Sequence, residues 1–154
     1  MPVARVKELL DKHGIKYVCM LHSPAYTAPE VAAAAHIPGS ELAKTVMVKL
    51  DDQMAMAVLP ASEHIDFDLL AEEADCDEAS LASEAEFQDL FPDCEVGAMP
   101  PFGNLWDLPV YVSETLADES HIAFSAGSHT EVMSLSFDDF RRMVEPRIMD
   151  FSMR

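Results

Sequence analysis

The chain has 154 residues, of which 49% are hydrophobic, and a formal net charge of −18 at pH 7. Its length predicts one domain over residues 1–154 that buries roughly two-thirds of the unfolded-chain surface. No apolar run reaches the ~20 residues of a membrane-spanning helix. The three cysteines have neither the even number nor the spacing of a disulfide framework or a zinc site. We therefore expect a cytoplasmic protein with no metal and no cofactor.

The acidic residues are concentrated in the middle of the chain. Residues 51–140 contain 22 of the 28 acidic residues and no lysine or arginine, whereas residues 1–50 and 141–154 each have a net charge of +2. The broad basic face of a typical nucleic-acid-binding protein is therefore excluded. Any contact with RNA would be made by the two ends of the chain, against a repulsive field.

Apolar periodicity predicts a helix over residues 2–13 and a strand over residues 16–21. Thr27 and Glu30 then have the spacing of a capping box, which predicts the start of a short alanine-rich helix. Two further apolar runs, 45–50 and 54–59, are joined by a short polar segment and predict a β-hairpin.

The second half of the chain predicts helices over residues 67–74 and 84–91. Short strands are expected at 95–97 and 109–112, followed by a strand pair and a last helix, at 121–125, 130–135 and from Ser136 onward. Strands and helices are interleaved without a regular alternation of strand and crossover helix. This order predicts an α+β fold with a mixed sheet.

Glycine and proline are densest in the segment Gly97-Ala98-Met99-Pro100-Pro101-Phe102-Gly103. Glycine allows positive φ or the close approach of a ligand, and proline fixes φ and removes an amide donor. A Gly-x-x-x-Pro loop is thus a rigid shape that can present its remaining amide and carbonyl groups to a small ligand. A simple turn is the alternative interpretation.

Lys44 stands where an apolar strand begins. In a strand it shares a face with Val46 and Val48, which places it at the mouth of a pocket. An ammonium group there could bind a phosphate or stabilise a developing oxyanion. Spacing alone favours the alternative, a solvated lysine at a strand end.

Two histidines are further candidates. His129 follows a tight turn at Gly127, where it could donate to a ligand or orient water, or simply be exposed. His22 precedes Ser23-Pro24 and either lines a pocket or packs under the next helix. The six histidines show no metal-ligand spacing.

The order of these segments resembles the YbaK family of aminoacyl-tRNA deacylases, which is related to the editing insertion domain of bacterial prolyl-tRNA synthetase. The resemblance extends from about residue 3 to residue 146. Its matching segments are Tyr26-Thr27 with the capped helix, Ala43-Lys44-Thr45-Val46, Val58-Leu59-Pro60-Ala61, residues 96–103 and residues 124–130. It implies a largely antiparallel, partly closed sheet with surrounding helices, and hydrolysis of the ester between a wrong amino acid and the 3′ end of a tRNA.

The resemblance also implies the roles of individual residues. Lys44 corresponds to the lysine most closely tied to activity. The remaining candidates would bind the aminoacyl group: Gly97, Ala98, Met99, Pro100, Pro101, His129, Tyr26, Thr27 and His22. The similarity to the branch that acts on cysteinyl-tRNA is looser, because that branch usually lacks the histidine at position 129.

This chemistry needs no catalytic triad, because an aminoacyl ester is already activated. Lys44 and amides of the 97–103 loop could hold the ester carbonyl while water or the ribose hydroxyl of the substrate attacks. We therefore expect a hydrolase that acts on the acceptor end of tRNA mischarged with a small amino acid, with a synthetase as a further candidate partner. The alternative is a non-catalytic module that binds a nucleotide or an aminoacyl group. The charge of −18 favours the module, and the pairing of Lys44 with Gly97 and Pro101 favours the enzyme.

Overall fold

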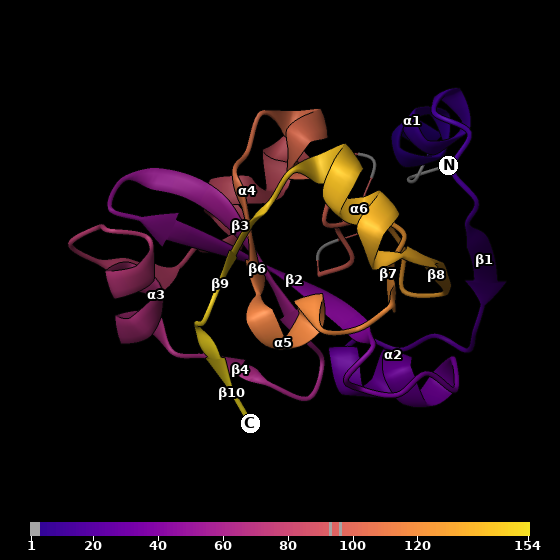
Figure 1. Cartoon of the computed structure of the whole chain (residues 1–154), viewed down its shortest axis with the longest axis horizontal. Helices are drawn as coiled ribbons and strands as arrows, with labels where there is room; N and C mark the ends of the chain where they lie inside the picture. Colours follow the sequence, from indigo (N-terminus) through magenta and orange to yellow (C-terminus); the bar gives the residue numbers. More distant parts are fainter. Residues whose placement is uncertain (1–3, 93, 96) are drawn as a thin grey trace.

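The hairpin of strands β2 (Leu42–Leu50) and β3 (Gln53–Pro60) lies at the centre of the fold, as predicted. The computed structural model describes residues 4–92, 94–95 and 97–154 (Figure 1). Val48 and the β3 residues 55–59 are completely buried, so both faces of the hairpin are covered. Apolar runs of this kind indicate a strand inside a sheet.

The main sheet extends from the hairpin in both directions, in the order β1-β8-β7-β2-β3-β6-β9, and β5 pairs with β2. The added strands are β1 (Val18–Leu21), β5 (Ala79–Leu81), β6 (Val110–Ser113), β7 (His121–Ser125), β8 (Glu131–Ser136) and β9 (Arg147–Met149). Pairings β2·β7, β3·β6 and β6·β9 are parallel and the others antiparallel, so the predicted mixed, largely antiparallel sheet is confirmed. Within the described chain the order is open from β1 to β9, which corrects the expected partial closure.

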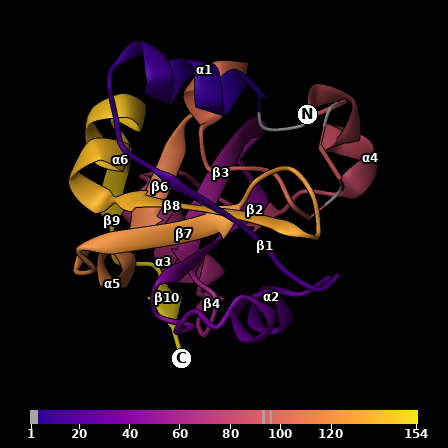
Figure 2. The ribbon, with the colours of Figure 1, turned by 90° about the vertical axis from the view of Figure 1, so that its right-hand side faces the viewer.

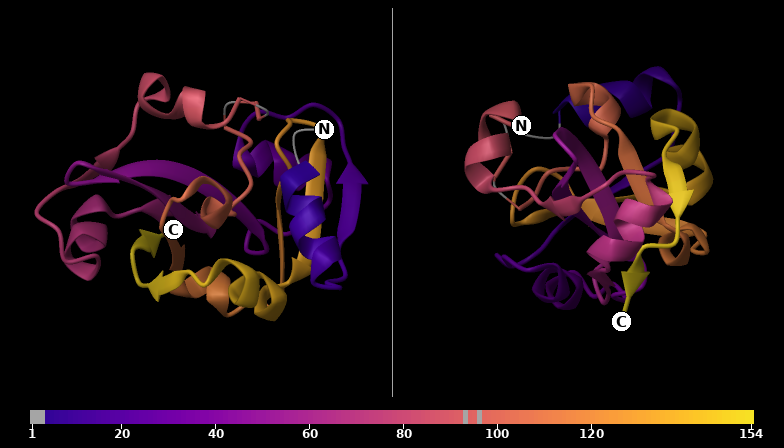
Figure 3. Two further views of the ribbon diagram at one scale, coloured as in Figure 1. Left: turned by 90° about the horizontal axis from the view of Figure 1, so that it is seen from above. Right: turned by 90° about the vertical axis from the view of Figure 1, so that its left-hand side faces the viewer.

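Helices cover the sheet at three places, each with its own hydrophobic cluster. Helix α1 (Ala4–Lys12) and helix α6 (Phe137–Val144) pack into the largest cluster. Helix α2 (Ala28–Ala34) packs beside β7 in a second cluster, and Figure 2 shows it across that strand from α1 and α6. Helix α3 (Phe67–Glu73) packs on the hairpin, at the end of the molecule away from α1 (Figure 3).

Short elements complete the chain and were not predicted. They are α5 (Glu114–Ala117), the 3-10 helix η2 (Gly103–Trp106), and the two-stranded sheet of β4 (His64–Ile65) and β10 (Ser152–Met153). The helix predicted over 84–91 is divided into α4 (Glu84–Phe87) and the 3-10 turn η1 (Gln88–Leu90). The strand predicted over 95–97 is wrong, because Glu95 belongs to no strand and Gly97 lies in a turn; position 96 is outside the described residues.

Candidate functional site

Two turns that are distant in sequence are joined by backbone hydrogen bonds. The amide of Glu95 donates to the carbonyl of Gly127, and the amide of Gly127 donates to the carbonyl of Ala98, both at 2.8 Å. Gly97 and Gly127 have φ values of +87° and +91°, which side chains of L-residues rarely tolerate. The 97–103 loop and the 127–129 turn therefore form one unit, held at the end of β7.

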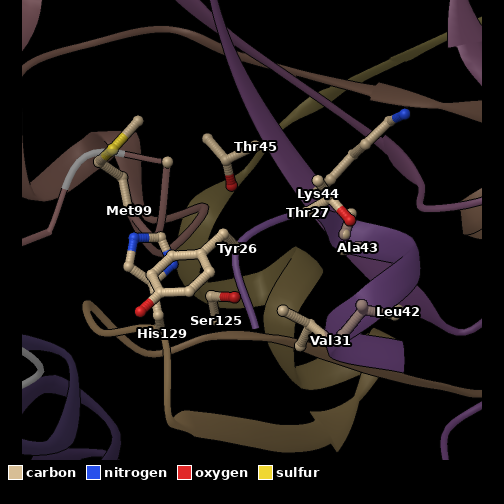
Figure 4. A pocket seen from close by; sticks show the side chains of 12 residues that line it. Tyr26, Thr27, Val31, Leu42, Ala43, Lys44, Thr45, Met99, Ser125 and His129 are labelled. Carbon is tan, nitrogen blue, oxygen red and sulfur yellow. The ribbon is translucent and has the colours of Figure 1, made fainter. Parts of the chain in front are cut away.

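A small cavity opens where this unit meets β2 and the start of α2 (Figure 4). Its volume is about 30 Å³. The lining residues are Tyr26, Thr27, Ala28, Val31, Leu42, Ala43, Lys44, Thr45, Gly97, Met99, Ser125 and His129. Six of the residues predicted from the sequence thus meet in one place: Tyr26, Thr27, Lys44, Gly97, Met99 and His129.

The N-terminus of α2 brings Tyr26 and Thr27 to the cavity. The hydroxyl of Thr27 accepts from the amide of Glu30 at 3.3 Å and donates to the Glu30 carboxylate at 2.8 Å. The predicted N-cap is therefore confirmed. This bond fixes Thr27 at the point where the chain turns from an extended segment into the helix.

Lys44 lies inside β2, opposite Leu59, and not at the start of the strand as predicted. Burial lowers the pKa of its ammonium group, and the negative charge of Glu63 acts in the opposite direction. Figure 4 shows the side chain of Lys44 extending away from the rings of Tyr26 and His129. The lysine therefore borders the cavity without filling it.

Glu63 is a buried carboxylate, only 8% exposed, in the turn after β3. Its Oε1 atom accepts hydrogen bonds from the hydroxyls of Thr115 at 2.9 Å and Ser152 at 2.6 Å. The hydroxyl of Ser113 lies within hydrogen-bond distance of both donors. These bonds hold the carboxylate in place, and its negative charge acts on Lys44.

His129 forms the opposite wall of the cavity. Its ring lies 4.8 Å from that of Tyr26, and its Nε2 atom is 3.6 Å from a carboxylate oxygen of Glu95. A Cβ atom placed on Gly97 would lie 3.8 Å from the Cε1 atom of this histidine. The histidine is therefore held between an aromatic ring, a carboxylate and a bare stretch of backbone.

Four predicted residues do not line this cavity. Ala98, Pro100 and Pro101 are buried and are absent from the lining of the cavity. His22 lies beside the second turn, where its amide donates to the carbonyl of Thr130 at 2.9 Å. Its Nδ1 atom is 2.7 Å from the carbonyl of Ser23, and its Nε2 atom is buried with no hydrogen-bond partner among the described residues.

Six lining residues were not predicted from the sequence. They are Ala28, Val31, Leu42, Ala43, Thr45 and Ser125. All of them except Leu42 belong to segments that carried the family resemblance, and that membership was the available signal. The apolar ones are otherwise indistinguishable in the sequence from ordinary core residues.

The described residues contain neither a candidate metal cluster nor a helix that could span a membrane. No group of three or more histidine, cysteine, aspartate or glutamate residues among them could hold a metal ion. None of the helices in the same part of the chain has the length and apolar character needed to cross a membrane.

Comparison with known proteins relates this geometry to a function. A family model described as the aminoacyl-tRNA editing domain matches residues 22–143. The chain is 29% identical over 155 residues to the multifunctional Ser/Thr-tRNA deacylase ProXp-y of Escherichia coli K12, with 96% of this chain and 90% of that protein covered. The same protein of E. coli O157:H7 matches equally.

Solved structures share the fold. The protein APE2540 superposes with a TM-score of 0.85 at 20% identity, covering 97% of this chain and 99% of its own. A proposed trans-editing enzyme for prolyl tRNA synthetase gives 0.81 at 18% identity, covering 99% and 98%. Both likenesses extend over essentially the whole chain.

Proposed function

The chain belongs to the aminoacyl-tRNA editing domain family and is an aminoacyl-tRNA deacylase, and on that premise we propose that it removes serine or threonine from mischarged tRNA. The bond between the carbonyl carbon and the ribose oxygen breaks, and one water is consumed. The products are the free amino acid and a tRNA with a restored hydroxyl. The observation that carries this proposal is the meeting of Lys44, Gly97 and His129 at one small cavity.

The size and polarity of the cavity support a small, hydroxyl-bearing side chain. A single water molecule needs roughly 10–15 Å³ of cavity volume. The cavity of about 30 Å³ therefore has room for only a few atoms. Thr27, Thr45 and Ser125 contribute hydroxyl groups to its wall. The similarity to a Ser/Thr-tRNA deacylase supports the same substrate class.

Lys44 is the proposed catalytic residue. Negative charge develops on the ester carbonyl oxygen during attack, and a preorganised cation in a partly dry site stabilises it. The buried charge of Glu63 supports the protonated form, although burial of the lysine itself opposes it. Because Lys44 extends away from His129 in the free protein (Figure 4), the amino acid would fit between the two.

We propose that the remaining lining candidates bind the aminoacyl group. Gly97 and Met99 would form one wall, His129 and Tyr26 a second, and Thr27 the entrance beside α2. These walls support a cavity that selects the amino acid by the size of its side chain.

We further propose that residues 1–154 are one domain and that the protein works in the cytoplasm, where tRNA is charged. Support for one domain comes from the structural matches, which cover 97% and 99% of the chain. A synthetase that passes on its misacylated product is a further proposed partner. The reaction proposed here requires no cofactor.

A panel of tRNAs charged with serine, threonine, alanine, proline and leucine tests the function. We expect release of serine and threonine, slower release of alanine and the slowest release of leucine. Lys44→Ala should lower the rate of release by about 10²–10³-fold, and Leu90→Ser, an exposed change on η1, should keep the wild-type rate. Rapid release of leucine, or no release of any amino acid, would contradict the proposal.

A further inference from the structure

Lys44 borders a second hollow as well as the small cavity. This second hollow has a volume of about 310 Å³ and is lined by Lys44, Val46, His64, Ile65, Phe67 and Leu81. The side chain of Lys44 extends away from the His129 wall (Figure 4). Lys44 therefore stands between a small polar cavity and a larger, more apolar hollow.

The two compartments match the two halves of the substrate. An aminoacyl-tRNA carries a small amino acid on one side of its ester and the terminal adenosine on the other. If Lys44 acts on the ester carbonyl and the amino acid occupies the small cavity, the nucleoside must lie next to Lys44 and outside that cavity. The second hollow has this position, and its volume lies within the roughly 300–1,000 Å³ of small-molecule sites.

The walls of the second hollow suit a nucleobase. Phe67 and Ile65 are half-buried and pack against the hydrophobic cluster under α3, so they are held in place. Leu81 is 65% exposed and forms an open apolar edge. Bases stack on aromatic side chains without help from a basic surface.

This hollow and a neighbouring one differ in the charge of the residues that line them. A third hollow, of about 240 Å³, shares Val46 and Leu81 with it but also includes Glu84. Lys49, on the same strand as Val46, is already paired with Glu86 of α4 at 2.8 Å. The second hollow has no carboxylate among its lining residues and has Lys44 and His64, so it is the better place for a nucleotide that carries phosphate.

We propose that the hollow of Val46, His64, Ile65, Phe67 and Leu81 binds the terminal adenosine of the tRNA acceptor end, with the base against Phe67 and Leu81. This inference rests on the proposed function, because it takes the ester to lie at Lys44. It also explains how a chain with a net charge of −18 acts on tRNA: an apolar hollow holds the base, and few phosphates need to be neutralised.

The test compares two esters of serine with the same ribose 3′-hydroxyl, one of adenosine and one of a ribose that carries no base. The readout is the ratio of their kcat/KM values, which is independent of the fraction of folded protein in a preparation. We expect the wild type to prefer seryl-adenosine by about 10-fold or more, a size typical of one stacked base. Leu81→Ser and Phe67→Ala should bring this ratio close to one.

Two controls separate this inference from the proposed function. Leu90→Ser, at another exposed leucine, should keep the wild-type ratio, and Lys44→Ala should slow both esters together. A wild-type ratio near one, or an unchanged ratio in both hollow variants, overturns the adenosine site and leaves the deacylase proposal intact. A wild type that does not release serine from seryl-tRNA overturns both.

Discussion

The ring of Tyr26 lies 4.8 Å from the ring of His129 and is tilted by 51° relative to it. Tyr26 is 70% exposed, whereas the side chain of His129 is only 14% exposed. The tyrosine thus covers the histidine from the solvent side, and the pair closes the wall of the cavity opposite Lys44 (Figure 4). This wall limits how large a side chain can enter.

Removing the imidazole should therefore relax the selection by size. We expect His129→Ala to raise the release of valine and leucine relative to serine by about 10-fold or more, since a methylene in such a pocket changes binding by about 1–3 kcal/mol. The measurement is the ratio of rates on the differently charged tRNAs. Tyr26→Phe keeps the ring contact and should keep the wild-type ratio. Unaltered selectivity in His129→Ala would show that another wall sets the size.

Replacing Gly97 should reduce the deacylase activity more than it reduces the stability of the fold. Gly97→Ala introduces a Cβ atom at φ +87°, facing the Cε1 atom of His129. Gly14→Ala is a matched control, because Gly14 has φ +65° and nothing within 4 Å of the added atom. Both variants should lose about 1–2 kcal/mol of stability, measured by denaturant unfolding.

Only the Gly97 variant should slow deacylation, and Gly97→Val should slow it further. Equal activity of Gly97→Ala and Gly14→Ala would mean that the loop has no contact with the aminoacyl group. A structure of the Gly97 variant would then be expected to show His129 in its original place.

Long periodic segments of this fold were predictable, and the shortest were not. The β2·β3 hairpin and α6 show a clear apolar period, and the hairpin and the start of α6 after Ser136 were predicted. The pair β4·β10 has two residues in each strand, too few to show any period. The two strands meet beside Glu63, whose buried carboxylate accepts hydrogen bonds from Ser152 and Thr115. Such a long-range bond leaves no local pattern.

The same limit applies to the site. Lys44, Gly97 and His129 are recognisable because glycine and charged residues stand out against their neighbours. Pro101 also stands out, but it fixes the backbone of the loop and is itself buried, so it does not line the cavity. Thr45 lines the cavity from β2, which begins at Leu42, three residues before the apolar run that predicted the strand.

Replacing Lys44 should affect chemistry far more than folding. Lys44→Ala is expected to lower kcat by about 10²–10³-fold, the usual effect of removing one oxyanion donor. The melting temperature should change little, because burial already disfavours the charged form. Lys44→Arg should restore part of the rate at most, since the planar guanidinium has a different reach. Full activity of the alanine variant would remove Lys44 from the mechanism.

The activity should decrease at alkaline pH, because the proposed role of Lys44 requires its protonated form. Burial lowers the pKa of Lys44, so the decrease should begin at a lower pH than for an exposed lysine. Glu63 raises this pKa, and Glu63→Gln should therefore move the alkaline limb to still lower pH.

The measurement is kcat/KM against pH, after subtraction of the uncatalysed ester hydrolysis. Ser152→Ala removes a hydrogen bond to Glu63 but keeps the charge, so its alkaline limb should stay near that of the wild type. A limb that is the same in Glu63→Gln and in the wild type would show that Glu63 does not act on Lys44.

Binding of tRNA should depend only weakly on salt. Several of the few basic residues are already engaged: Lys7, Lys49 and Arg142 form ion pairs with acidic neighbours, and the guanidinium of Arg5 lies over the ring of Trp106 at 5.2 Å. Few cations are therefore left to neutralise phosphates. Because each neutralised phosphate adds about 0.7–0.9 to the slope of log K against log salt, we expect a slope magnitude of about 1–3. Titration of uncharged tRNA at several salt concentrations measures it. A steep slope with tight binding would mean that a second chain supplies the basic surface that this one lacks.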